Sequence, residues 1–194
     1  LIKGKVKPGE RVAIIGAGGI GFDVAAFLAA PRERSLSLDP QAFFEHWGVR
    51  YEARGGVHDV KPHPLSSGRT IYLLQRKDER LGKRLGKTTG WAHRRQLIAQ
   101  GIHMLQGVNY GDLDTQGLWI ERTLHGKLVK ERLEVDQVVV CAGQESENRL
   151  FPELERAGVR AFLIGGAKLA GELDAKRAIE DGVRLAADLE NLLQ

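Results

Sequence analysis

Six residues near the start of the chain, Gly16-Ala17-Gly18-Gly19-Ile20-Gly21, have the spacing of a phosphate-binding turn. They match the pattern G-x-G-x-x-G directly after the apolar run at residues 12–15. In such a turn Gly16 permits the tight bend, Gly18 lets the backbone approach a pyrophosphate, and Gly21 lets the following helix pack closely on the strand. N–H groups at the start of that helix would then face the phosphates. We therefore predict dinucleotide binding and keep a purely structural turn as the weaker alternative.

A second group of residues, Gln75-Arg76-Lys77, ends the next apolar run at residues 70–75. An NAD site usually places Asp or Glu at this strand end, where the carboxylate binds the ribose 2′-hydroxyl. A carboxylate would repel the 2′-phosphate of NADP, whereas a guanidinium binds it through two hydrogen bonds. We predict that Gln75, Arg76 and Lys77 contact the cofactor and that Arg76 and Lys77, with Arg80 as a further contact, select NADPH. The alternative is a solvated basic loop.

Strands and short helices must hold these residues at one edge of a sheet. Apolar runs bounded by glycine predict strands, and apolar positions at helical spacing predict helices. The expected strands are at residues 12–15, 70–75, 102–105, 135–142 and 161–164, and the expected helices are at 22–30, 40–47, 91–100, 151–157 and 173–193. Asp39 should cap the helix that begins at Pro40, and Thr88 or Thr89 the helix near Trp91. Residues 107–135 read as an antiparallel meander with tight turns.

This order of elements predicts an α/β, Rossmann-like NAD(P)-binding domain with a central parallel sheet and an antiparallel meander. We expect that domain to span residues 1–145, with 31–69 as an insertion. The insertion is inferred because the residue that binds the adenosine ribose normally lies about 20 positions after the glycine turn. Here the second strand ends much further along, at Gln75.

Composition restricts the remaining functional classes. The 194 residues are 42% hydrophobic and 28% charged, which is typical of a globular protein, and no apolar run is long enough for a membrane helix. The net charge is +4, but only Trp91 accompanies the basic cluster, so we do not expect nucleic-acid binding. The single cysteine, Cys141, fits a reducing cytoplasm, and the histidines show no metal-ligand spacing. The first residue is Leu1, so we expect a piece of a longer chain.

Several longer segments occur in an order that resembles the C-terminal part of bacterial NADPH-dependent 2,4-dienoyl-CoA reductase. These segments are IGAGGIGFDVA, LLQRK, LGKTTGWAHR, VCAGQE, IGGA and ELDAKRAI. The segments at residues 86–94 and 172–179 are more specific than the glycine turn. The resemblance covers nearly the whole chain.

The resemblance implies a parent enzyme that serves fatty acid β-oxidation. Such an enzyme carries FMN, an iron–sulfur cluster and the substrate site in an N-terminal barrel, followed by an FAD domain into which the NADPH domain is inserted. NADPH would pass hydride to FAD, and electrons would continue through the cluster to FMN. The missing barrel and flavin domains would be the partners of this chain, which alone should lack activity.

The resemblance also assigns roles to particular residues. Gly19 joins Gly16, Gly18 and Gly21 at the NADPH pyrophosphate, and Gly143 and Gln144 end the strand beside the nicotinamide. Residues 146–194 would return to the flavin domain, with Gly165 and Gly166 near FAD. No catalytic acid or base is expected, because hydride transfer requires stacking and position from the protein.

Two alternatives remain open at this point. The chain could be the NADP(H)-binding module of another flavoprotein oxidoreductase, or a sensor that binds NADP(H) without catalysis. The weakest alternative is a basic interaction domain in which the glycines only form a turn. Binding of NADPH separates the last alternative from the others.

Overall fold

The computed structural model describes residues 3–31, 38–50, 63, 66–171 and 174–193. The chain divides into two compact units, Leu1–Ala142 and Gly143–Gln194, which are described separately here. All strands among the described residues belong to the first unit, and the second unit is helical. No helix in the described ranges is both long and apolar enough to cross a lipid bilayer.

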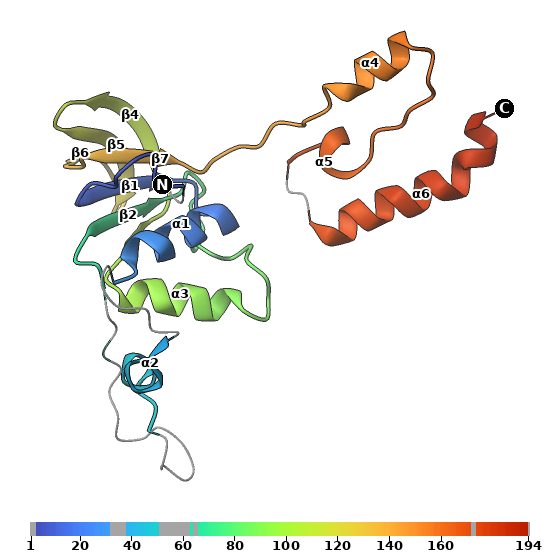
Figure 1. The fold of residues 1–194 in the computed structure, drawn as a ribbon. Helices are drawn as coiled ribbons and strands as arrows, with labels where there is room; N and C mark the ends of the chain where they lie inside the picture. The colour runs from blue at the N-terminus through green and yellow to red at the C-terminus, as the bar shows by residue number, and fades with distance from the viewer. Residues whose placement is uncertain (1–2, 32–37, 51–62, 64–65, 172–173, 194) are drawn as a thin grey trace. The chain divides into compact units, whose positions relative to one another are not determined.

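A parallel sheet of four strands forms the centre of the first unit (Figure 1). Its order is β3-β2-β1-β7, with β1 at Arg11–Ile15, β2 at Thr70–Leu74, β3 at His103–Leu105 and β7 at Gln137–Val140. Helices α1 (Gly19–Ala29) and α3 (Gly90–Ala99) pack on one face. The α/β, Rossmann-like fold class predicted from the sequence is therefore confirmed.

Side chains that alternate along β1 and β2 build two cores, one on each face of the sheet. Val12 and Ile14 are fully buried against Phe22 and Leu28 of α1. Ala13 points to the opposite face, where the core is completed by Leu74 of β2 and by Val108, Leu118, Ile120 and Leu133. Burial on both faces explains why β1 reads as a continuous apolar run, as central parallel strands do.

The second face is covered by an antiparallel sheet of three strands, β4 (Asn109–Asp114), β5 (Gly117–Leu124) and β6 (Lys127–Leu133). This confirms the predicted meander. The Asp114 carboxylate accepts hydrogen bonds from the backbone N–H groups of Gln116 and Gly117 and thereby shapes the turn between β4 and β5. His125 and Gly126 form the next turn with positive φ angles of 50° and 77°.

Helix α2 (Pro40–Trp47) lies between α1 and β2 in the chain. Asp39 caps it as predicted, since its carboxylate accepts a hydrogen bond of 2.9 Å from the Ala42 N–H. Gly48 ends the helix in the left-handed conformation, with φ at 66°. The rest of the predicted insertion at 31–69 falls largely on residues outside the described ranges.

The second unit contains α4 (Leu150–Arg156), α5 (Gly165–Lys168) and α6 (Ala175–Leu193). The predicted strand at 161–164 is wrong, because these residues form no strand pairing and lead into α5. A strand needs a neighbouring strand for its backbone hydrogen bonds, and the described residues of this unit provide none. The Asp181 carboxylate instead accepts a 3.0 Å hydrogen bond from the Gly165 N–H.

Candidate functional site

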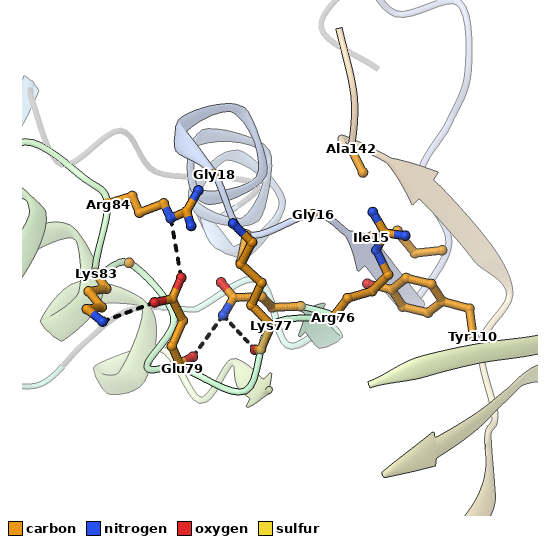
Figure 2. Close-up of a pocket in the computed structure, with 13 residues that line it drawn as sticks. Ile15, Gly16, Gly18, Arg76, Lys77, Glu79, Lys83, Arg84, Tyr110 and Ala142 are labelled. Atoms are coloured by element: carbon orange, nitrogen blue, oxygen red, sulfur yellow. Dashed lines mark hydrogen bonds and ion pairs between the residues drawn. The ribbon is translucent and has the colours of Figure 1, made fainter. Parts of the chain in front are cut away.

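A pocket of about 440 Å³ opens at the carboxyl ends of β1 and β2 (Figure 2). In parallel α/β sheets this edge is where ligands bind, because loops and helix N-termini converge there. The pocket brings together the glycine turn after β1, the basic loop after β2, Tyr110 of β4, and Ala142, which follows β7. Its lining is Ile15, Gly16, Ala17, Gly18, Gln75, Arg76, Lys77, Glu79, Gly82, Lys83, Arg84, Tyr110 and Ala142.

The glycine turn is shaped by two close backbone approaches, at Gly16 and Gly21, and by open space at Gly18. Gly16 has φ at +108°, and a Cβ there would lie 2.6 Å from the Cys141 carbonyl oxygen. A Cβ on Gly21 would lie 1.8 Å from the Gly16 carbonyl oxygen, so only glycine lets α1 start this close to the strand. Gly18 is the N-cap of α1, and a Cβ there would meet nothing within 4 Å. Open space at Gly18 fits a bound diphosphate, because the backbone is left accessible to a ligand.

The loop after β2 is held by the side chain of Gln75. Its amide nitrogen donates hydrogen bonds of 2.9 Å and 2.8 Å to the carbonyl oxygens of Lys77 and Glu79. The Lys77 carbonyl also accepts a 3.2 Å bond from the N–H of Gly107. Gln75 therefore positions the loop that carries Arg76 and Lys77. This positioning role differs from the ligand contact that the sequence suggested.

Arg76 and Lys77 carry the positive charge that is available to a ligand in this pocket. Both are exposed, and neither forms a side-chain hydrogen bond or ion pair with any residue in the described ranges. Figure 2 shows their side chains leaving the end of β2 in different directions, with Arg76 directed toward Tyr110. A phosphate group would face little competition from the protein for these two cations.

Glu79 also lines the pocket but is neutralised by neighbouring cations. Its carboxylate lies 3.1 Å from the ammonium of Lys83 and 3.3 Å from Nε of Arg84. Hydrogen bonding to Lys83, reinforced by the charges of Lys83 and Arg84, lowers the pKa of Glu79 below its usual value. Asp78 accepts a 3.0 Å hydrogen bond from the side chain of Gln106.

Tyr110 of β4 is the pocket residue that sequence reasoning missed most clearly. It is half-buried, and burial raises the pKa of its phenol while the nearby charge of Arg76 opposes that change. Its ring offers an aromatic surface beside the guanidinium. No sequence signal marks it, because the meander reaches the pocket only through its packing on the central sheet.

The other predicted residues are more dispersed. Arg80 lines a neighbouring cavity and is not part of this pocket. Gly19 is the first residue of α1. Gly143, Gln144, Gly165 and Gly166 belong to the second unit, so their roles remain predictions.

Cys141 follows β7 and is half-buried, with burial raising the pKa of its thiol. A raised pKa disfavours the thiolate, which is the nucleophilic form, so Cys141 fits a structural cysteine better than a nucleophile. Within the described residues no group of three or more His, Cys, Asp or Glu side chains is arranged to hold a metal ion.

Comparisons with known proteins agree with this architecture. A curated metal reductase from Desulforamulus reducens is 21% identical over 167 residues, which are 86% of this chain and 23% of that protein. The structure of 2-naphthoyl-CoA reductase in complex with 2-naphthoyl-CoA superposes with a TM-score of 0.60 at 20% identity, covering 93% of this chain and 21% of that one. Histamine dehydrogenase from Rhizobium sp. 4-9 superposes with a TM-score of 0.59 at 17% identity, covering 97% of this chain and 25% of that one.

The chain thus spans about a quarter or less of the length of these relatives. The sequence profile of the pyridine nucleotide-disulphide oxidoreductase family matches residues 1–173, which is most of the chain. With a glycine turn, a parallel sheet and a basic pocket at its carboxyl edge, this chain belongs to the pyridine nucleotide-disulphide oxidoreductase family.

Proposed function

We propose that this chain is the NADPH-binding module of a flavin- and iron–sulfur-dependent reductase of 2,4-dienoyl-CoA thioesters. The observation that carries the proposal is the placement of Arg76 and Lys77. Both line the pocket at the end of β2, and neither pairs with an acidic group in the described part of the chain. A cation at this position distinguishes NADP from NAD, because the two cofactors differ there by a phosphate group.

The pocket residues fit a dinucleotide in three regions. The backbone at Gly16 and Gly18 and the start of α1 would hold the pyrophosphate. Arg76 and Lys77 would hold the 2′-phosphate, and Tyr110 lies beside them as a surface for the adenosine. When bound, the nicotinamide supplies a hydride donor, and the protein contributes orientation.

Gln75 supports this selectivity indirectly. With both of its amide protons given to loop carbonyls, it fixes the backbone on which Arg76 and Lys77 stand. A glutamate at position 75 would place a carboxylate against two carbonyl oxygens and beside the bound phosphate. Repulsion from both would disfavour NADPH.

The substrate class rests on the sequence resemblance described above, which implies FAD, FMN and an iron–sulfur cluster in the parent chain. The similar fold of a reductase that was solved with 2-naphthoyl-CoA supports a parent that acts on acyl-CoA. Histamine dehydrogenase has an equally similar fold, so the second candidate is the same module in a flavoprotein with another substrate. Assay of the full-length parent with NADPH and 2,4-hexadienoyl-CoA decides between the two. No turnover of the dienoyl thioester would exclude the first.

Substitution of Arg76 tests the cofactor assignment. We expect Arg76→Ala to weaken NADPH binding by about 1–3 kcal/mol, because one charge-assisted contact to phosphate is lost. NADH binding should change little. Fluorescence titration of both cofactors measures the two affinities, with Arg132→Ala on β6 as the control for a general change in charge. Equal losses for NADPH and NADH would refute the role of Arg76.

A further inference from the structure

A second cavity of about 470 Å³ lies beside the first, between the loop at 80–87 and the start of α3. Its lining includes five cationic side chains and no carboxylate. These cations are Arg80, Lys83, Lys87, Arg94 and Arg95. The cavity shares only Gly82 and Lys83 with the dinucleotide pocket, so the two are adjacent but have different linings.

Most of this positive charge is uncompensated. Lys83 pairs with Glu79, whereas the other four cations form no ion pair with any described residue. The Nε of Arg94 is buried and has no hydrogen-bond partner in the described structure. Four cations that line one cavity without an acidic partner favour an anion there, because an anion would accept charge-assisted hydrogen bonds from them.

The rim of the cavity carries an aromatic surface. Trp91, the second residue of α3, is 69% exposed and also lines the cavity. Its indole N–H donates a 2.9 Å hydrogen bond to the Thr88 carbonyl, which fixes the orientation of the ring. An exposed and oriented indole next to a cluster of cations is suited to stacking a base whose phosphates contact the cations.

We propose that this cavity is a second anion-binding site, which takes a diphosphate group and is separate from the dinucleotide pocket. Its volume falls in the range of about 300–1,000 Å³ that is typical of small-molecule sites, and it exceeds what a single phosphate needs. Four cations without acidic partners match the charge of a diphosphate. The diphosphate is either free or part of a nucleoside diphosphate whose base rests on Trp91.

Calorimetric titration of the whole chain with inorganic pyrophosphate, in the presence of saturating NADPH, tests the proposal. NADPH occupies the first pocket, so we expect the remaining heat to report one pyrophosphate per chain. Arg94→Gln should weaken pyrophosphate binding about tenfold and leave the NADPH affinity unchanged. Lys87→Gln, on the exposed loop, provides a second variant in case the change at Arg94 disturbs α3. Arg156→Gln on α4 makes the same change in charge at a residue that does not line the cavity.

Titration with ADP under the same conditions identifies the source of the diphosphate. Tighter binding of ADP than of pyrophosphate, lost in Trp91→Ala, supports a nucleotide, whereas equal binding supports free diphosphate. The proposal is overturned if NADPH abolishes pyrophosphate binding, or if Arg94→Gln and Lys87→Gln both bind pyrophosphate as the unmodified chain does. The result for Arg94→Gln and Lys87→Gln does not depend on NADPH or on Arg76, so it separates a failure of this proposal from a failure of the NADPH assignment.

Discussion

At the scale of single residues, two glycines of one turn have different physical roles. A methyl group on Gly21 would collide with the Gly16 carbonyl oxygen at 1.8 Å, so Gly21 is required by the fold. A methyl group on Gly18 would meet no protein atom within 4 Å, so Gly18 is free of such a packing requirement. The space at Gly18 is available to the ligand.

We therefore expect Gly21→Ala and Gly18→Ala to separate stability from binding. Gly21→Ala should lower the free energy of unfolding by about 1–3 kcal/mol, the usual cost of overpacking. Gly18→Ala should leave stability nearly unchanged and weaken NADPH binding, because the methyl group occupies the approach to the backbone. Urea denaturation and fluorescence titration measure the two effects.

Gly19→Ala is the matched control for stability, since its added methyl group also meets no atom within 4 Å. The account of the turn would be contradicted if Gly18→Ala bound NADPH as tightly as the unmodified chain. It would equally be contradicted if Gly21→Ala were as stable as Gly19→Ala.

Some pocket residues could be predicted from the sequence and others could not. Gly16, Gly18, Arg76 and Lys77 were predicted, because a local pattern fixes where strand-end residues lie, and all four line the pocket. Their contacts with a cofactor stay a prediction. The positioning role of Gln75 was missed, because it depends on the path of the loop.

At the scale of elements, the start of β1 is tied to the residue that precedes β7. The Asp136 carboxylate accepts bonds of 3.1 Å and 2.8 Å from the Arg11 guanidinium, and another of 2.8 Å from the Arg11 backbone N–H. Hydrogen bonding to Arg11 and the attraction of its charge lower the pKa of Asp136. These contacts join neighbouring strands that are far apart in sequence.

This pairing predicts a specific dependence of stability on pH. Because the pKa of Asp136 is lower in the folded chain, its contribution is complete above the unfolded value of about 3.9 and is lost as the pH falls through the folded value. Asp136→Asn should therefore lower the Tm near neutral pH, and the difference from the unmodified chain should shrink below about pH 4.

Thermal melts between neutral and acidic pH measure this difference. Asp112→Asn on β4 controls for the general loss of a carboxylate. A difference in Tm for Asp136→Asn that stays constant down to the lowest pH would show that the charge of Asp136 does not stabilise the pair.

The elements of the first unit were predicted well, because each is encoded locally. Residues 12–15 and 70–75 were expected as strands, and β1 and β2 occupy Arg11–Ile15 and Thr70–Leu74. The strand expected at 161–164 was wrong because apolar residues alone do not provide a pairing partner. Thr89 is the N-cap residue of α3, as predicted. Its side chain makes no capping hydrogen bond, so the position of the cap was predicted correctly and its hydrogen bond was not.

At the scale of the whole molecule, the division into two units has a consequence for binding. The unit Leu1–Ala142 contains every residue of the dinucleotide pocket and both hydrophobic cores. We expect a chain truncated after Ala142 to fold cooperatively and to bind NADPH within about threefold of the full chain, a difference below 1 kcal/mol.

Circular dichroism and fluorescence titration of the truncated chain check this expectation, with the full chain as the reference. Loss of NADPH binding by a truncated chain that remains folded would assign part of the site to the second unit. Gly143 and Gln144 would then be the first residues to substitute.

The most direct measurement of the central claim is a crystal structure of the chain with NADP⁺ bound. The account predicts that the pyrophosphate lies against the backbone of Gly16 and Gly18. It also predicts that the 2′-phosphate lies within hydrogen-bonding distance of Arg76 or Lys77. A 2′-phosphate bound away from both cations, or a glycine turn without the pyrophosphate, would contradict it.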